Sequence, residues 1–417
     1  MNKISNYFER LLIFLIYLSF FYGFFNYEDA AGGGKIDLDH IYHNIQLFKN
    51  NNFFNIPWDQ YDSTSLPLYY LITKYLIPFN DIFVFKLFTF FLSLCSIFFF
   101  YKILKIKFGS NNGILLASSI PLLSPYFRTS AFWGIEENIA YFFFLISSFF
   151  FLKNIKDPRY SLIAIIAVCL TFYGRQNYAF LVIIFFFYFF NFKKFFSINN
   201  FSIICLFVLF LLPSLYFFYE WGGLVNNKNI SSSRIYFQLF NIPIILSIFF
   251  FYYIPIIFLN IKTYYKKIFS IKKIILFFIL FLVYYILFKI DAQLLFTKNI
   301  GSGVIYKLFF NFSFFNGYPD IALILFLFIS FLGLIFSIYF CINNYNYFIF
   351  FITSLFIFSF ANIIFQEYFD PLIYFFIFIF GNIFKKKDLK YVCRNYFIFY
   401  FILLLSSLIY RNYISII

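Results

Sequence analysis

Charged residues are scarce in this chain. Asp, Glu, Lys and Arg make up 12% of its 417 residues, whereas 63% are hydrophobic. So little polar surface cannot cover a water-soluble globule of this size. The five cysteines are scattered and follow neither a disulfide framework nor a metal-ligand spacing. The composition therefore excludes a soluble protein and indicates an all-α polytopic membrane protein.

Two kinds of ligand site are also missing from the sequence. No Gly-rich loop of a nucleotide site occurs among the 15 glycines, and no cluster of His, Cys, Asp and Glu has metal-ligand spacing. We therefore expect no cofactor and no metal.

No internal repeat pairs the two halves of the chain, which argues against the commonest transporter architectures.

Apolar runs long enough to cross a bilayer recur along the chain. Several are shorter than the ~20 residues of an ordinary span, so we expect about eleven to thirteen transmembrane helices. We treat the first run as a retained helix and not as a cleaved signal peptide. Residues 1–417 are expected to form one integral-membrane domain with no separate soluble domain. The runs lie at 11–27, 82–101, 114–127, 138–152, 160–174, 177–192, 201–219, 235–259, 274–290, 320–341, 346–365, 371–384 and 396–410.

The charge distribution predicts the orientation in the membrane. If the N-terminus is cytoplasmic, the connections on that side hold most of the 32 basic residues. Of the 17 acidic residues they hold only Glu9, Asp157 and Asp388. The positive-inside rule therefore favours a cytoplasmic N-terminus. Because the lysines alternate from loop to loop and form no basic face, the net charge of +15 does not indicate a nucleic-acid partner.

Polar side chains concentrate on the opposite, outer side. Most acidic residues and all three tryptophans fall in outer segments. We expect residues 27–81 to form a first outer loop with short interfacial helices. Residues 290–319 form a later outer loop, which is either a lid or a simple connection. Any chemistry is expected on the lumenal or periplasmic side, although Trp and acidic residues also occur at outer interfaces without a function.

The first outer loop carries a spaced polar set. Asp39, His43 and Gln46 follow an i, i+4, i+7 spacing, which puts all three on one face of a short helix. A carboxylate at the mouth of a membrane cavity can act as a general base. The same pattern also fits an amphipathic helix on the membrane surface whose polar residues are simply solvated.

Further outer segments carry candidates for binding an anion. The Glu136–Glu137 pair follows Arg128, and a very tight connection between two apolar spans holds Arg175, Gln176 and Asn177. An arginine there needs an anionic partner, which is either a ligand phosphate or a lipid headgroup reached by snorkelling. Hydroxyls at 63–65 are placed to cap the next helix, whose N-terminal amides favour an anion. Weaker candidates are Arg234 and Lys298.

Several of these segments resemble one enzyme family. The run DHIYHNIQ (39–46) is similar to a signature of the dolichyl-phosphate-glucose α-1,2-glucosyltransferases, which add the terminal glucose to the lipid-linked N-glycan precursor. WDQYDSTSLPLY (58–69), the run leading to Glu136, GRQN (174–177) and FYEWGGLV (218–225) resemble later segments of that family in order and rough spacing. FQEYFDP (365–371) departs from the family's Asn-Arg-His-Tyr run and looks more like bacterial C-type glycosyltransferases.

The resemblance implies a C-type (GT-C) membrane glycosyltransferase with a catalytic first outer loop. Such an enzyme moves a sugar, here glucose by preference, from a polyprenyl phosphate to a lipid-linked or surface glycan with inversion. It implies Asp39 as general base and Glu136 as a residue that orients acceptor or base. It implies substrate contacts at His43, Gln46, Trp58, Asp59, Thr64, Arg175, Gln176, Asn177, Arg234 and Lys298.

The residues leave other functions open. A transporter or flippase of a lipid-linked or anionic substrate would use membrane-facing acids and arginines as coupling or gating groups. A C-type transferase with another sugar is a second alternative. The expected location is the endoplasmic reticulum membrane in a eukaryote, or the inner membrane in a bacterium.

Overall fold

The structure is a computed structural model of the chain. It describes residues 2–61, 63, 65–77, 81–109, 113–154, 157, 159–223, 237–259, 271–290, 301, 303–310, 317–342, 344–361 and 363–414. Regular structure in these residues is helical, and no strand occurs among them, as the sequence predicts. The chain divides into two compact units. Unit 1 is Met1–Ser233 with Tyr400–Ile417, and unit 2 is Arg234–Phe399. The prediction of a single domain stays a prediction.

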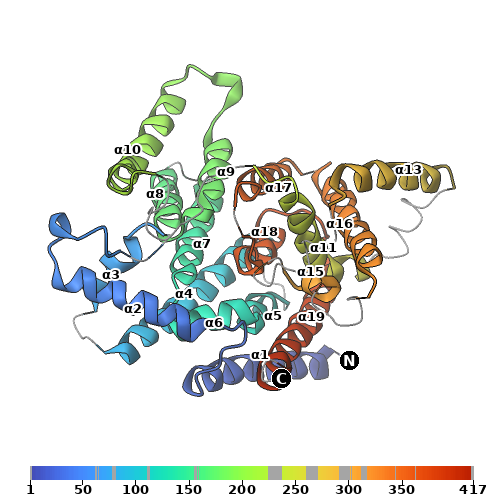
Figure 1. Cartoon of the computed structure of the whole chain (residues 1–417), viewed down its shortest axis with the longest axis horizontal. Helices are drawn as coiled ribbons and strands as arrows, with labels where there is room; N and C mark the ends of the chain where they lie inside the picture. The colour runs from blue at the N-terminus through green and yellow to red at the C-terminus, as the bar shows by residue number, and fades with distance from the viewer. Residues whose placement is uncertain are drawn as a thin grey trace. The chain divides into compact units, whose positions relative to one another are not determined.

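Unit 1 contains the first ten helices (Figure 1). The loop of residues 27–81 folds into two of them, α2 and α3, and α2 packs against α3 and α6. The segment Tyr400–Ile417 belongs to this unit, where Arg411 donates a 2.6 Å hydrogen bond to Ala31 O. The helices are α1 (Asn2–Phe25), α2 (Gly34–Asn50), α3 (Leu68–Leu76), α4 (Ile82–Phe108), α5 (Gly113–Ser119), α6 (Pro125–Trp133), α7 (Glu137–Asn154), α8 (Tyr160–Gly174), α9 (Ala179–Phe189) and α10 (Ile198–Trp221).

Unit 2 is built around the contact between α11 and α16. Gly333 of α16 lies so close to Leu246 O of α11 that a Cβ there would collide with this carbonyl. A small residue is thus needed where the two backbones meet. Its helices are α11 (Asn241–Leu259), α13 (Ile271–Phe288), α15 (Gly303–Phe310), α16 (Pro319–Cys341), α17 (Tyr345–Phe358), α18 (Leu372–Ile379) and the first part of α19 (Leu389–Ile409).

Among the residues that the structure describes, six helical stretches are long and apolar enough to cross a bilayer, which makes the chain an integral, polytopic membrane protein. Five shorter apolar helices and one bent pair, α6 with α7, accompany them. The expected count of eleven to thirteen spans treats these as spans too and stays a prediction. The six stretches are Tyr7–Phe25, Ile82–Phe108, Ile198–Trp221, Asn241–Phe258, Pro319–Cys341 and Lys386–Asn412.

Two expected spans have a different structure. The apolar run 114–127 divides into α5, the 3-10 helix Ile120–Leu123 and the start of α6. Within the apolar run 371–384 the helix α18 covers only Leu372–Ile379, and each of its residues is buried. Eight residues extend about 12 Å, far less than the ~30 Å of a bilayer core. A helix that is apolar all round is equally suited to a protein core, and composition alone does not separate the two environments.

Two neighbouring helices of unit 1, α4 and α7, carry opposite charges at their two ends. In α4, Asp81 caps the first turn by accepting a 2.8 Å hydrogen bond from Phe83 N, while Lys105 and Lys107 lie in the last turn. In α7, Glu137 lies in the first turn and Lys153 in the last. These signs match the helix dipole and separate an acidic end of the unit from a basic one.

Candidate functional site

A sharp break between α6 and α7 creates the candidate site in unit 1. The two helix axes bend by 111° at residues 134–136. Gly134 has a φ of 76°, and a Cβ at this position would collide with the Phe85 ring of α4. Its carbonyl accepts a 2.5 Å hydrogen bond from Tyr69 Oη, and Ile135 N donates to Ser130 O at 3.0 Å. Glycine is thus required here both for its backbone conformation and for its lack of a side chain.

Glu136 lies at this break and is almost fully enclosed, with 4% of its surface exposed. Its Oε1 accepts hydrogen bonds from Tyr70 Oη and from Ser63 Oγ, the latter at 3.1 Å. Ser63 Oγ also accepts from Ser65 N at 3.0 Å. Donors from α3 and from the segment before it therefore bind one carboxylate oxygen.

The tyrosines near Glu136 are held in their neutral form. Burial is the main cause that raises the pKa of Tyr61, Tyr69 and Tyr70 well above 10.0, and the negative charge of Glu136 raises it further. Tyr61 Oη donates a 2.6 Å hydrogen bond to Ser65 O. These phenols therefore act as fixed hydrogen-bond donors.

Glu137 and Arg175 form an ion pair next to Glu136. Arg175 Nη1 pairs with Glu137 Oε1, and their side chains are only 16% and 5% exposed. Glu137 opens α7 and Arg175 follows the last residue of α8, so each charge also suits the helix end beside it. A Cβ on Gly174 would lie 3.3 Å from the Ala140 backbone, so glycine lets the two helices approach at this point.

Asp37 of α2 belongs to the same electrostatic environment. Surrounding protein atoms raise its pKa above 3.8 although its side chain is exposed, and the charges of Asp29 and Glu136 raise it as well. The charges of Arg175 and His40 act in the opposite direction. The first turn of α2 thus brings a carboxylate within electrostatic reach of Arg175 and Glu136. Sequence reasoning missed Asp37, which is exposed at the edge of the helix face that carries the buried Ile41 and Ile45, at i+4 and i+8.

Arg128 lies apart from the two glutamates that follow it in the sequence. It is 1% exposed and pairs with Glu28 through Nε at 2.6 Å and Nη2 at 2.7 Å. The remaining donors reach Ser19 Oγ (3.1 Å), Ser19 O (2.8 Å) and Leu122 O (3.2 Å). All five N–H groups of the guanidinium are therefore satisfied, which is the arrangement of a structural arginine.

The predicted polar set of α2 lies on the face opposite its core contacts. Asp39 and His43 are exposed and Gln46 is half-buried, whereas Leu38, Ile41, Ile45 and Phe48 are buried. The predicted helix and the common face of the three side chains are thus present. Asp39 is open to a ligand that approaches from solvent or from the membrane surface.

The other predicted contacts are dispersed. Trp58 packs edge-on against Phe48, Tyr61 and Phe217, with ring centroids 5.5 to 6.0 Å apart, and Asp59 is exposed. Gln176 and Asn177 are half-buried beside Arg175, and Gln176 Nε2 is buried with no hydrogen-bond acceptor. Thr64, Arg234 and Lys298 lie outside the described residues.

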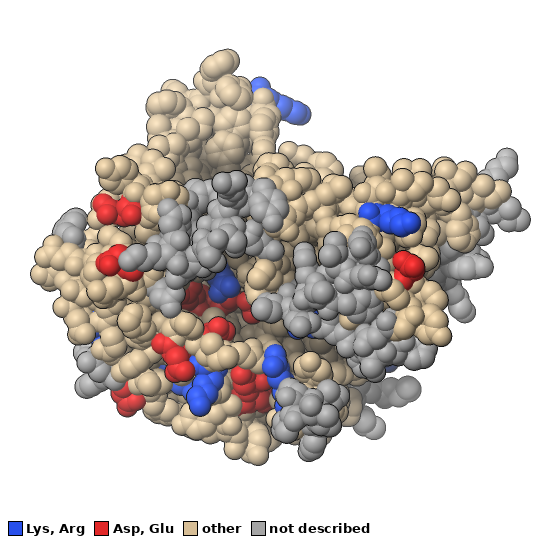
Figure 2. Space-filling model, viewed as in Figure 1, with Lys and Arg blue, Asp and Glu red and all other residues tan. Residues whose placement is uncertain are grey.

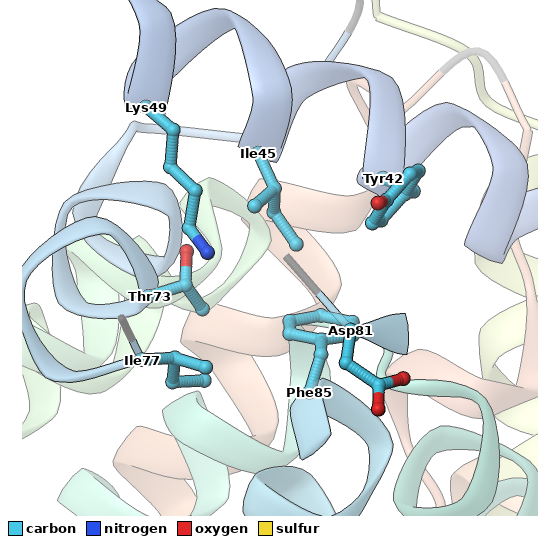
Figure 3. A pocket seen from close by; sticks show the side chains of 7 residues that line it. All are labelled: Tyr42, Ile45, Lys49, Thr73, Ile77, Asp81 and Phe85. Atoms are coloured by element: carbon cyan, nitrogen blue, oxygen red, sulfur yellow. The ribbon is translucent and has the colours of Figure 1, made fainter. Parts of the chain in front are cut away.

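Two further observations limit what the site can hold. Among the described residues, no three His, Cys, Asp or Glu side chains lie close enough to bind a metal ion. Figure 3 shows a crevice beside α2, in which the ammonium of Lys49 points toward the Thr73 hydroxyl while the Asp81 carboxylate points away. Its volume of about 10 Å³ holds roughly one water molecule.

Some charged side chains of unit 1 lie together on the face that Figure 2 shows. In Figure 2, acidic and basic side chains lie close together where Figure 1 shows α1, α2 and α6. Comparison of the chain with protein-family models, with curated proteins and with solved structures gives no match. The chemistry must therefore be argued from the residues and from their arrangement.

Proposed function

We propose that the protein is a membrane glycosyltransferase of the GT-C class that transfers a sugar, with glucose favoured, from a polyprenyl phosphate to a lipid-linked or surface glycan. One observation carries the proposal. The DHIYHNIQ segment lies within the helix α2, which offers Asp39 and His43 on its open face, while Asp37 on the same helix lies within electrostatic reach of Arg175 and Glu136. Asp37 thus supports the proposal, because it lies two residues from the proposed base Asp39 and is coupled to the proposed phosphate-binding cation Arg175.

The proposed reaction is a single inverting displacement. The Asp39 carboxylate takes the proton of the acceptor hydroxyl as the hydroxyl oxygen bonds to the anomeric carbon. The bond between that carbon and the phosphate oxygen breaks, and its electron pair leaves on the polyprenyl phosphate. Arg175 stabilises this leaving phosphate, because a guanidinium donates paired hydrogen bonds to such an anion.

Other residues position these groups. Glu136, held by Tyr70 and Ser63, orients the acceptor or the base. His43 and Gln46 flank Asp39 on α2 and contact sugar hydroxyls. The Gln176 amide, which lacks an acceptor, suits a phosphate or sugar oxygen beside Arg175. The reaction takes place on the lumenal or periplasmic side, as the charge bias of the loops predicts.

The test is transfer of a labelled sugar by the purified full chain in lipid nanodiscs. The donors are polyprenyl-phosphate glucose, mannose and arabinose, and the acceptor is a lipid-linked oligosaccharide pool. We expect transfer from the glucose donor and an inverted anomeric configuration in the product. Transfer from another donor instead would keep the class and change the sugar. No transfer from any donor would contradict the proposal.

The bent pair α6 and α7 favours a second candidate, a transporter or flippase. Discontinuous helices with charged groups at the break are typical of transporters. Such a protein would move an anionic or lipid-linked substrate across liposome membranes when no glycan acceptor is present. A flux without transfer would favour this function over the enzyme.

A further inference from the structure

Lys86 is a buried cation that the proposed reaction does not use. It is the fifth residue of α4, and 4% of its surface is exposed. Its Nζ lies 4.0 Å from the centroid of the Trp133 ring and 4.4 Å from that of the Tyr27 ring. In the part of the chain that the structure describes, no carboxylate and no hydrogen-bond acceptor pairs with this ammonium. Two aromatic rings are its partners.

The two acidic residues that directly follow Tyr27 in the chain, Glu28 and Asp29, are committed elsewhere. Trp133 Nε1 donates to Glu28 O at 2.9 Å, which ties the ring to residue 28. The Glu28 carboxylate itself accepts two hydrogen bonds from Arg128, from Nε and from Nη2. Asp29 accepts hydrogen bonds from Gly32 N at 2.9 Å and Gly34 N at 3.0 Å. The protein therefore offers Lys86 no counter-ion from this loop.

An ammonium in this position needs an anion. Cation–π contacts offset only part of the cost of removing an ammonium from water. Snorkelling would carry the charge to the membrane surface, but the Lys86 side chain stays enclosed between two rings. An ionisable group at such a place in a membrane protein indicates a functional contact with a partner.

The surroundings indicate the chemistry of that partner. Lys86 lies four residues inside the start of a 27-residue span, about 6 Å along the helix axis. The Tyr27 and Trp133 rings around the Lys86 ammonium form an aromatic cage. Apolar side chains close to it in the sequence are exposed, and Tyr27 itself is 58% exposed. A ligand at this depth has its charge at the membrane interface and its apolar chains beside Phe25, Ile82 and Phe83.

We propose that Lys86, held between Tyr27 and Trp133, binds the phosphate of a phosphodiester lipid that carries a single negative charge. One ammonium matches one such charge, and the two rings replace the water on its flanks. An anionic phospholipid and a polyprenyl-phosphate sugar both carry this group. The proposal does not rest on the proposed function, because a transporter would have the same site.

Tyr27 offers a variant that removes one ring without straining the backbone. It has a φ of 53°, in the left-handed region where glycine is at ease, and it follows the end of α1. Tyr27→Gly therefore removes one wall of the cage while relieving the backbone. Lys86→Met removes the charge. Lys74→Met is the matched control, since Lys74 also lies against a tyrosine ring but donates to Asn51 O.

The experiment counts the lipids that the purified full chain retains in native mass spectrometry. The probes are dioleoyl phosphatidylglycerol, polyprenyl-phosphate glucose and zwitterionic phosphatidylcholine. We expect wild type and Lys74→Met to retain one anionic lipid at least about tenfold more tightly than phosphatidylcholine. Lys86→Met and Tyr27→Gly should lose this preference. The anionic probe that is retained more tightly identifies the source of the phosphate.

Two results would overturn the proposal. One is an undiminished preference for anionic lipid in Lys86→Met. The other, which decides alone if Lys86→Met is not recovered folded, is an undiminished preference in Tyr27→Gly.

Discussion

The two units satisfy their buried polar groups in different ways. Besides neutral hydroxyls and amides, unit 1 encloses several charged side chains, and two ion pairs are among them, Arg128 with Glu28 and Arg175 with Glu137. In unit 2 the buried polar side chains are mostly neutral hydroxyls and amides, with the fully buried Asp370 as an exception. Charged pairs are costly to bury and add little net stability over apolar packing. Their concentration in unit 1 is one more reason to assign the chemistry to that unit.

The neutral network of unit 2 shows the contrast. Tyr347 Oη donates to Tyr253 Oη at 2.7 Å, and Tyr253 Oη shares a 3.0 Å hydrogen bond with Ser337 Oγ. Gln366 bridges two segments by donating to Tyr252 Oη at 3.0 Å and accepting from Val304 N at 2.7 Å. Such contacts fix the packing of helices without any group that could change its charge near neutral pH.

The largest effect is expected at Arg128. Arg128→Met leaves the Glu28 carboxylate enclosed without a counter-charge, which should lower the free energy of unfolding by about 3–5 kcal/mol. Thermal unfolding in detergent measures the loss. The control is Arg159→Met, which breaks the exposed Arg159–Asp157 pair and should leave the melting temperature unchanged. Equal melting temperatures for the two variants would contradict a structural role for Arg128.

The next effect concerns activity. Arg175→Gln should lower transfer by about 100-fold, because the leaving phosphate loses its cation. The variant also leaves the enclosed Glu137 carboxylate without its counter-charge. The double variant Arg175→Gln/Glu137→Gln should therefore recover stability but not transfer. Transfer near the wild-type rate in the folded double variant would mean that the ion pair only holds α7 and α8 together and takes no part in the reaction.

A smaller loss is expected in unit 2. Gln366→Ala leaves Val304 N and Tyr252 Oη without their partner, which should lower the free energy of unfolding by roughly 1–3 kcal/mol. Transfer per folded molecule should not change. Substitution of the exposed Gln60 by Ala serves as the control. A collapse of transfer in folded Gln366→Ala would erase the functional difference between the two units.

The smallest expected effect is a change in pH dependence. Because the pKa of Asp37 is raised above 3.8, the folded protein binds this proton more tightly than the unfolded chain does. Stability should therefore fall as the pH rises from about 3.8 through the raised pKa. Asp37→Asn should remove this decline, and Asp39→Asn is the matched comparison. Identical melting temperature profiles for wild type and Asp37→Asn would refute the assignment.

Much of the helical structure follows from the sequence. Most expected apolar runs coincide with a helix, and the polar spacing of residues 39–46 predicts α2 with its exposed face. The run 371–384 could not be assigned correctly, since α18 is enclosed by unit 2 and its composition equals that of a lipid-facing helix. Hydropathy reports a low-polarity environment and does not say which one.

The candidate site was predictable only where its residues are close in sequence. The Glu136–Glu137 pair and the GRQN run stand out by themselves, and the structure joins them through Glu137 and Arg175. Arg128 precedes the two glutamates, yet its partner Glu28 is 100 positions away. Such long-range pairing depends on how α1 and α6 pack, which no local pattern encodes.

The central claim is sugar transfer with Asp39 of α2 as base. The most direct measurement compares transfer from polyprenyl-phosphate glucose by wild type, Asp39→Asn and Asp37→Asn, each verified as folded. We predict that transfer collapses in Asp39→Asn and persists in Asp37→Asn. Equal transfer by wild type and Asp39→Asn would contradict the account, and a collapse in Asp37→Asn alone would move the base to Asp37 on the same helix.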